Sequence, residues 1–377
     1  MEDLARRYAA GTLADVVPSA LAGLGVSTEA NTLGLPSADR VCVLLVDGLG
    51  WLSLREHADV APFLAQAAER SLTAGFPSTT ATSVASLGTG LTPGEHGVVG
   101  YAFEAGRDVL NVLGWRRHTG GKPIDLRERV VPEQLQPRPT AFERAAAAGV
   151  GVRVVGPRDQ RDSGLTRAAL RGGEFRGVHA LGDLTASVVE ALQEPRSLCY
   201  AYHADLDLLG HVHGPGSTPW LYQLAYVDRL AETIAGRLPR GGALIVTADH
   251  GMVTVGERVD YDAEPALQAG VRVVGGEARA RHVYAVEGAA ADVEAAWRET
   301  LGDRAWVLGR EEAAAAGWFG PRVAEQVLPR IGDVVVAARG TAAVVRTEGE
   351  PRLSRMTGQH GSVTDEEILV PLAISRG

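Results

Sequence analysis

The sequence of 377 residues predicts an α/β fold, with a doubly wound, mostly parallel sheet flanked by helices and a smaller α+β insert. Three apolar runs carry this prediction: Val41–Val46, Leu198–Tyr202 and Ala243–Thr247. Each run is continuously apolar, which is typical of a strand buried on both faces of a parallel sheet. Helical patterns separate the runs, and such alternation indicates parallel β–α–β units.

Helices are expected before and between these strands. The first forty residues read as two short helices followed by a loop rich in Asn, Gly and Pro. Apolar residues at helical spacing predict helices at 60–70, 140–149 and 219–238, whereas residues 150–157 read as one more strand. A closing strand is expected near the C-terminal end, after a loop that contains His360.

The character of the sequence changes near Tyr261. Residues from there to Thr347 read as strand, strand, helix and strand. We therefore predict one α/β core formed by residues 1–260 and 350–377, and an inserted α+β subdomain at residues 261–349.

Composition argues against several classes of function. The formal net charge is −9 and no basic run is dense enough to bind a polyanion, so no nucleic-acid partner is expected. No apolar run approaches the roughly 20 residues that span a bilayer, and the first residues lack the apolar centre of a signal peptide. Cys42 and Cys199 lie in strand-like runs and are expected to be free thiols. A soluble cytoplasmic enzyme is predicted, with no indication of its oligomeric state.

Carboxylate and imidazole groups gather at the ends of the predicted strands. Six potential metal ligands lie in four loops: Asp47, Asp207, His211, Asp249, His250 and His360. Each motif alone is common and has ordinary structural roles, but in open α/β sheets this carboxyl edge is where ligands bind. The mixture of ligands suits zinc, with manganese or iron as alternatives, and six ligands are enough for two ions. We predict two divalent metal ions, an arrangement that enzymes use for phosphoryl displacement.

The stretch FPSTTATS, residues 76–83, places five hydroxyl groups before a predicted helix. The N–H groups and dipole at a helix N-terminus favour an anionic oxygen and a phosphate. Thr80 is expected to cap this helix, and near a metal ion its hydroxyl would lose a proton more easily. The alternative is that all five hydroxyls serve only as caps or in local turns.

Five motifs occur in the order found in the alkaline phosphatase superfamily: LLVDGLG, FPSTTATSVASLGTGLTPGEHGVVGY, DLDLLGHVHGP, TADHG and GQHG. The chain most resembles the type I phosphodiesterase/nucleotide pyrophosphatase branch, although segments 104–195 and 255–350 match none of its motifs. The resemblance implies one zinc ion held by Asp47, Asp249 and His250 together with the nucleophile. It implies a second ion held by Asp207, His211 and His360. Gapless alignment selects Thr80 as the nucleophile, with Thr79 as the alternative.

The chain departs from the branch at two places. Thr82 and Ser83 stand where the branch has Pro-Asn, and Tyr101 stands where it has an Asn that donates to a phosphate oxygen. Because a tyrosine hydroxyl can also donate to an oxyanion, we predict a catalytic role for Tyr101, with a core position as the alternative. His96 and His213 are expected to shape loops. Asp205 is the alternative to Asp207 as a ligand, but the gapless fit of Gly210-His211 and Gly214-Pro215 favours Asp207.

The predicted function is hydrolysis of a phosphodiester or pyrophosphate bond in a small-molecule or nucleotide substrate, through a phosphothreonine intermediate at Thr80. The extra negative charge of a monoester is usually met by an Arg or a third ion, and neither Arg nor Lys occurs from Ser71 to Tyr101. Five residues further along could supply a charge or a stacking surface, or lie in the core: Phe103, Arg107, Trp115, Arg116 and Arg117. A phosphomonoesterase or a phosphosugar mutase with the same metal ligands is the alternative. A sulfatase would need a Cys/Ser-x-Pro-x-Arg motif, which is absent.

Overall fold

A central sheet of seven strands forms the core of the computed structural model, which describes residues 4–118 and 123–377. In spatial order its strands are β2 (Ala68–Thr73), β18 (Leu369–Arg376), β9 (Gly242–Thr247), β1 (Arg40–Val46), β8 (Ser197–His203), β6 (Gly151–Pro157) and β7 (Glu174–Val178). The strands from β9 to β7 are parallel, and β18 runs antiparallel to both of its neighbours. The predicted fold class, with its mostly parallel sheet, is confirmed.

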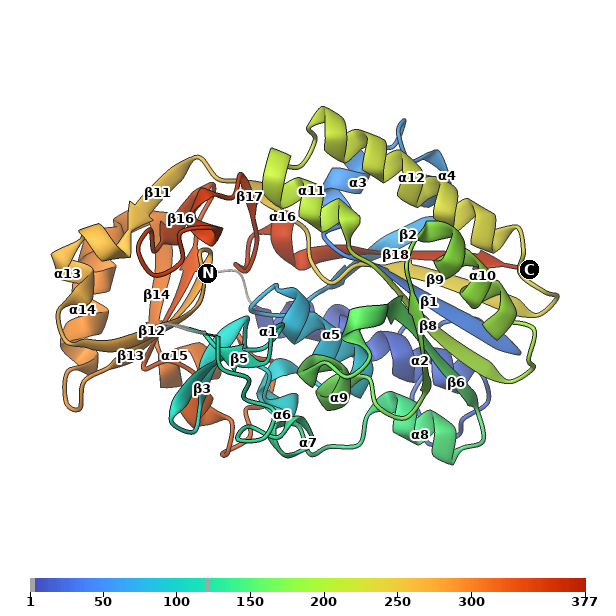
Figure 1. The fold of residues 1–377 in the computed structure, drawn as a ribbon, viewed down its shortest axis with the longest axis horizontal. Helices are drawn as coiled ribbons and strands as arrows, with labels where there is room; N and C mark the ends of the chain where they lie inside the picture. The colour runs from blue at the N-terminus through green and yellow to red at the C-terminus, as the bar shows by residue number, and fades with distance from the viewer. Residues whose placement is uncertain (1–3, 119–122) are drawn as a thin grey trace.

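Helices cover both faces of this sheet (Figure 1). One layer contains α3 (Trp51–Glu56), α4 (Pro62–Ala67), α10 (Leu181–Ala191), α11 (Asp205–His213) and α12 (Thr218–Ala235). The other contains α2 (Val16–Gly23), α5 (Thr80–Thr89), α8 (Ala141–Ala147) and α9 (Gly164–Ala169). Residues Val41–Val46 of β1 are all buried, which agrees with their continuously apolar sequence. Cys42 and Cys199 are buried free thiols on the adjacent strands β1 and β8.

The expected helix at residues 60–70 is only half correct. Helix α4 ends at Ala67, and residues 68–73 form β2 at the edge of the sheet. Its side chains include exposed Glu69 and Arg70, so the segment lacks the apolar run of the central strands. Backbone pairing with β18 decides the conformation here and overrides the helix-forming composition.

A second, smaller sheet lies beside the core (Figure 1, left). Its four antiparallel strands are β12 (Val271–Glu277), β13 (Ala280–Ala285), β15 (Val334–Ala338) and β14 (Ala305–Gly309). Helix α14 (Ala290–Leu301) packs on this sheet, and the two share a hydrophobic cluster of their own. All of these elements fall within the predicted insert, but the boundary at residue 261 stays a prediction. β11 (Glu257–Asp260), on the core side of that boundary, pairs with β16 (Ala342–Val345).

Two buried ion pairs join the smaller sheet to the core. Arg279 donates to both carboxylate oxygens of Glu367, at 2.7 and 2.6 Å, and Arg281 binds Glu350 in the same two-pronged way at 2.9 Å. A hairpin, β3 (Ala102–Ala105) with β4 (Asp108–Asn111), also contacts β12. Within the described ranges, no helix has the length and apolar character needed to cross a membrane.

Candidate active site

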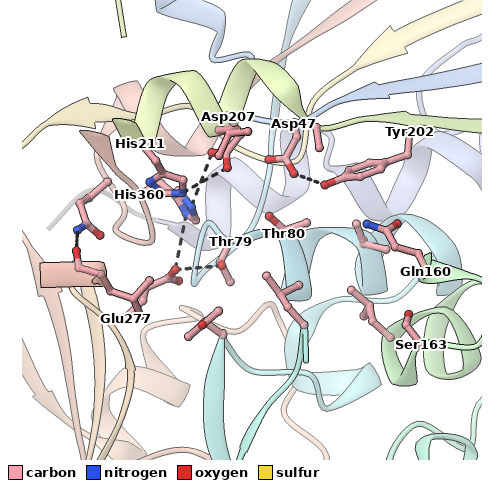
Figure 2. Close-up of a pocket in the computed structure, with 18 of the residues that line it drawn as sticks. Asp47, Thr79, Thr80, Gln160, Ser163, Tyr202, Asp207, His211, Glu277 and His360 are labelled. Atoms are coloured by element: carbon pink, nitrogen blue, oxygen red, sulfur yellow. Dashed lines mark hydrogen bonds and ion pairs between the residues drawn. The ribbon is translucent and has the colours of Figure 1, made fainter. Parts of the chain in front are cut away.

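The predicted metal ligands converge at the carboxyl edge of the central sheet. Asp47 directly follows β1, and Asp249 and His250 follow β9. Asp207 and His211 lie on α11, which begins after β8. His360 follows the short strand β17 (Gly358–Gln359). Figure 2 shows the side chains of Asp207, His211 and His360 pointing toward one another, with Asp47 beside them.

A first cluster consists of Asp47, Asp249 and His250. Their potential ligand atoms all lie within 4.8 Å of one another. His250 Nε2 is 3.5 Å from Asp47 Oδ1 and 3.5 Å from Asp249 Oδ2. The same nitrogen is 3.2 Å from Thr80 Oγ1, so the hydroxyl that the sequence singles out lies against this cluster.

A second cluster forms around Asp207. Its Oδ2 is 3.3 Å from His211 Nε2, and its Oδ1 is 3.9 Å from His360 Nε2. The rings of His360 and His250 are stacked with centroids 3.6 Å apart, and His250 is also within 4.8 Å of the Asp207 and His360 ligand atoms. The structure thus brings all six predicted ligands together, with His250 between the two clusters.

The three histidines are oriented by backbone carbonyl groups. In each ring Nδ1 lies at hydrogen-bonding distance from a carbonyl oxygen: Gly358 for His211 (2.8 Å), Gly251 for His250 (3.0 Å) and Ser78 for His360 (3.0 Å). A proton on Nδ1 satisfies this contact and leaves the lone pair of Nε2 free. This is the usual way in which a protein orients histidine ligands to a metal.

The buried carboxylates lack partners on the side that faces the clusters. Asp47 Oδ1, Asp207 Oδ1 and Asp249 Oδ2 are buried and accept no hydrogen bond. Burial, together with the charges of Asp249 and Asp207, raises the pKa of Asp47 well above its usual range. Unpaired buried carboxylates are costly, and divalent cations would remove that cost. The donor set therefore fits two metal ions.

His211 and Asp207 shift each other's pKa. Burial alone would lower the pKa of His211, but the charge and hydrogen bond of Asp207 outweigh it and raise that pKa to about 9. Burial alone would raise the pKa of Asp207, yet His211 brings it below its usual range. The two groups thus form an ion pair at neutral pH in the protein without metal.

Thr80 is the first residue of helix α5, and Thr79 occupies the N-cap position. The expectation that Thr80 caps the helix is wrong by one residue, because Thr79 has the extended backbone of a cap. The Thr79 hydroxyl donates instead to Glu277 Oε2 at 3.2 Å. With Thr79 engaged there, Thr80 is the hydroxyl beside His250.

A cavity of about 440 Å³ opens in front of Thr80 and both clusters. Figure 2 shows Gln160 and Ser163 on one side of it and Glu277 and His360 on the other. Among the described residues, those that line it include no Lys and no Arg. Much of the remaining lining is apolar: Val84, Leu113, Leu165, Leu170, Leu208, Leu353 and Met356.

Tyr101 also lines this cavity. Its ring packs edge-on against His118, with centroids 5.7 Å apart. Burial raises the pKa of Tyr101, and a hydrogen bond with the Asn111 side chain opposes the rise. The hydroxyl is therefore protonated at neutral pH and can act as a donor.

Several alternatives raised by the sequence lie away from the cavity. Asp205 and His213 are exposed on α11, whereas His96 is buried and lies 3.0 Å from Ser86 Oγ. Phe103 and Trp115 are buried in the hydrophobic core. Arg117 pairs with Asp108, and neither Arg107 nor Arg116 lines the cavity.

Two residues of the site had no recognisable signal in the sequence. Tyr202, on β8, donates a hydrogen bond to Asp47 Oδ2 and reads in the sequence as part of a buried strand. Glu277 comes from the smaller sheet, in a segment that matches no motif. Burial raises the pKa of Glu277 to about 8, and the Thr79 hydroxyl opposes this rise. Only the tertiary approach of β12 to the core brings this carboxyl into the site.

Comparisons with known proteins agree with this architecture. The family model for type I phosphodiesterase/nucleotide pyrophosphatase matches residues 41–363. No curated protein sequence matches the chain. Murine ectonucleotide pyrophosphatase/phosphodiesterase 5, solved as an inactive variant with AMP, has a TM-score of 0.69 at 18% identity, over 89% of this chain and 87% of that one. The human protein of the same name has a TM-score of 0.67 at 16% identity, over 89% of this chain and 87% of that one.

Phosphonoacetate hydrolase from Sinorhizobium meliloti 1021, solved with phosphonoformate, has a TM-score of 0.66 at 20% identity, over 90% of this chain and 91% of that one. At such identities these structures show a shared fold. The family model carries the assignment further, because it spans most of the chain and every loop that supplies a predicted ligand. The chain belongs to the type I phosphodiesterase/nucleotide pyrophosphatase family, within the alkaline phosphatase superfamily.

Proposed function

We propose that the protein is a two-metal phosphodiesterase whose nucleophile is Thr80. Family membership indicates a hydrolase that acts on phosphoester bonds. One observation carries the finer proposal: Thr80 Oγ1 lies 3.2 Å from His250 Nε2, at the start of α5 and at the floor of the cavity. A hydroxyl in this position can reach a phosphoryl group placed between the clusters.

Each cluster would hold one divalent cation. The first ion would be bound by Asp47, Asp249, His250 and Thr80. The second would be bound by Asp207, His211 and His360. When bound, such ions neutralise charge on the phosphoryl oxygens and lower the pKa of a coordinated hydroxyl. The ligand chemistry suits zinc, and manganese or iron remain alternatives.

Thr80 would act in two steps. Its hydroxyl loses a proton to solvent, and Oγ1 attacks phosphorus in line, so that a P–O bond to Thr80 forms as the ester P–O bond breaks. The leaving alkoxide takes up a proton and departs. Water then attacks the phosphothreonine, and Thr80 regains its proton. The N-terminus of α5 favours the negative oxygens at this point. Tyr101, which lines the cavity, would donate to one of them.

The charge of the cavity favours a diester as substrate. A monoester carries a second negative charge, which is usually met by a cationic side chain. The described lining offers none, and Glu277 adds a carboxyl group instead. A singly charged phosphodiester or phosphonate monoester is better matched to this site than a monoester of phosphoric acid or a sugar phosphate.

The proposal can be tested with metal-loaded protein and three substrates: bis(p-nitrophenyl) phosphate, p-nitrophenyl phosphate and a dinucleoside polyphosphate. We expect the diester to be hydrolysed faster than the monoester, and the reverse order would refute the diesterase assignment. Thr80→Ala should lower kcat by about 10³-fold or more, as expected for loss of a nucleophile. The matched control is Thr82→Ala, two residues along the same helix and outside the cavity lining, which should retain activity.

A further inference from the structure

Glu277 is a buried carboxyl group that the smaller sheet delivers to the catalytic cavity. It ends β12, and of the described residues in 261–349 only Glu277 and Ala278 line the cavity. Its exposed fraction is 8%, and Figure 2 shows the carboxyl group between Thr79 and His360. The smaller sheet therefore contributes one acidic side chain to a site otherwise built by the core.

The carboxyl group keeps unused hydrogen-bonding capacity. Oε2 accepts one hydrogen bond, from Thr79 Oγ1, and lies 3.8 Å from His360 Nδ1, which already contacts Ser78 O. Oε1 is buried and has no partner. A buried acceptor without a partner is costly, and at a substrate cavity the missing partner can be a group of the substrate.

Nearby basic residues do not neutralise Glu277. Arg281, four residues further on, donates to both oxygens of Glu350 and to Val344 O. Arg279 is similarly bound to Glu367. Glu277 also approaches His360 at Nδ1, at 3.8 Å, whereas Asp207 approaches that ring at Nε2, the nitrogen that faces the clusters. Its position thus matches neither a structural ion pair nor a ligand to the two proposed metal ions.

Glu277 lies on the side of the site where the leaving group should depart. Thr80 Oγ1 lies against the Asp47, Asp249 and His250 cluster. In-line displacement places the leaving alcohol opposite this oxygen, toward Asp207 and His360. Glu277 borders His360 on that side, so its carboxyl group faces substituents of the leaving alcohol.

We propose that Glu277 determines leaving-group specificity: it hydrogen-bonds a hydroxyl group on the leaving alcohol and disfavours anionic leaving groups such as phosphate or pyrophosphate. This inference rests on the proposed function and narrows its substrates to phosphodiesters of hydroxylated alcohols. A hydroxyl group can donate to a carboxylate and accept from a carboxylic acid, so it is matched to Glu277 in either protonation state. Two divalent cations bound nearby would favour the ionised form of Glu277. An anionic leaving group would then meet like charge, and no described Lys or Arg lies in the lining.

Monoesters of phenylphosphonic acid test this directly, because they have one cleavable ester bond and the alcohol must be the leaving group. Ethyl, 2-hydroxyethyl and carboxymethyl esters share an O–CH2 group and differ only in the methyl, hydroxymethyl or carboxylate group that follows it. Hydrolysis of the p-nitrophenyl ester shows separately whether the catalytic residues are active. These four esters are to be compared in wild type, Glu277→Gln, Glu277→Ala and the control Glu287→Gln, an exposed glutamate of the same predicted insert. Metal content by mass spectrometry and thermal unfolding are measured on each protein.

The wild type should prefer the 2-hydroxyethyl over the ethyl ester by about three- to tenfold in kcat/KM, the effect of one hydrogen bond. It should cleave the carboxymethyl ester slowest. Glu277→Gln should keep the hydroxyl preference but cleave the carboxymethyl ester about tenfold faster, because like-charge repulsion is removed. Glu277→Ala should lose the hydroxyl preference, whereas Glu287→Gln should match the wild type.

Three results would overturn the assignment. The first is that both Glu277 variants rank the esters by kcat/KM in the same order as the wild type. The second is an equal loss of kcat/KM on all four esters, which indicates a structural role. The third is the loss of one bound metal ion in Glu277→Gln, which indicates a cation ligand. If the metal-loaded wild type fails to cleave even the p-nitrophenyl ester, the proposed function itself is wrong. Cleavage of that ester without discrimination among the alkyl esters refutes only the role of Glu277.

Discussion

Asp207 and Asp205 lie on the same helix, two residues apart, and only Asp207 faces the site. Asp207 contacts His211 and His360, whereas Asp205 is exposed. We predict that Asp207→Asn loses about one of two bound metal ions per chain, because one carboxylate is removed from the second proposed ligand set. Asp205→Asn should bind as many metal ions as the wild type does. Mass spectrometry of the metal-loaded proteins measures both, and equal metal content in the two variants would contradict the proposed ligand set.

The pKa of Glu277 predicts how the stability of the metal-free protein depends on pH. The group has a pKa of about 8 when folded and an ordinary value of 4.5. Between these values the unfolded chain releases this proton while the folded chain holds it, so the free energy of unfolding falls as pH rises. Glu277→Gln removes this contribution.

In the absence of metal, the difference in unfolding free energy between Glu277→Gln and wild type should therefore grow in favour of the variant from pH 5 to pH 8. The change should be on the order of 3 kcal/mol. Denaturant unfolding at several pH values, with chelator present, measures it. A difference that is constant across this range would show that Glu277 titrates normally.

At the scale of elements, the ion pair between Arg279, in the turn just before β13, and Glu367 of the C-terminal segment fixes the loop that carries His360. Glu367 binds Arg279 and also accepts a hydrogen bond from Ser362 N at 3.0 Å, two residues after His360. Both charged side chains are fully buried. Arg279→Met leaves an unpaired buried carboxylate, which should cost about 3–5 kcal/mol of unfolding free energy.

An exposed pair provides the matched control. Arg272, on β12, pairs with Glu104 on β3, and the Arg272 side chain is 52% exposed. Arg272→Met should cost about 0–1 kcal/mol, because solvent screens the pair. Denaturant unfolding of both variants tests the contrast, and similar losses would mean that the Arg279 pair does not anchor the smaller sheet.

How far the sequence predicted each element depended on burial. The central strands β1, β8 and β9 are buried on both faces, so their apolar runs identified them and the ligands at their ends. The edge strand β2 is half exposed and made of helix-forming residues, so only its pairing with β18 reveals it. Glu277 was missed for a related reason, because it enters the site through packing between two sheets.

At the scale of the whole molecule, metal ions should stabilise the fold. Three buried carboxylate oxygens at the two clusters have no partner. Because a ligand that binds only the folded state stabilises it, zinc at 100 times its dissociation constant should add about 2.7 kcal/mol per bound ion to the free energy of unfolding. Thermal unfolding with chelator and with added zinc measures this. Added zinc should raise the unfolding temperature of Asp207→Asn by less than that of the wild type. An equal unfolding temperature of the wild type with and without metal would contradict the proposal.

The position of β18 has a consequence for synthesis on the ribosome. Among the described strands, β18, at residues 369–376, is the one that joins β2, at residues 68–73, to the sheet. Until those residues leave the exit tunnel, β9 presents an open edge and β2 has no partner strand. The nascent chain therefore completes its sheet after the other strands have been made, and a deletion that removes β18 also detaches β2, three hundred residues earlier in the sequence.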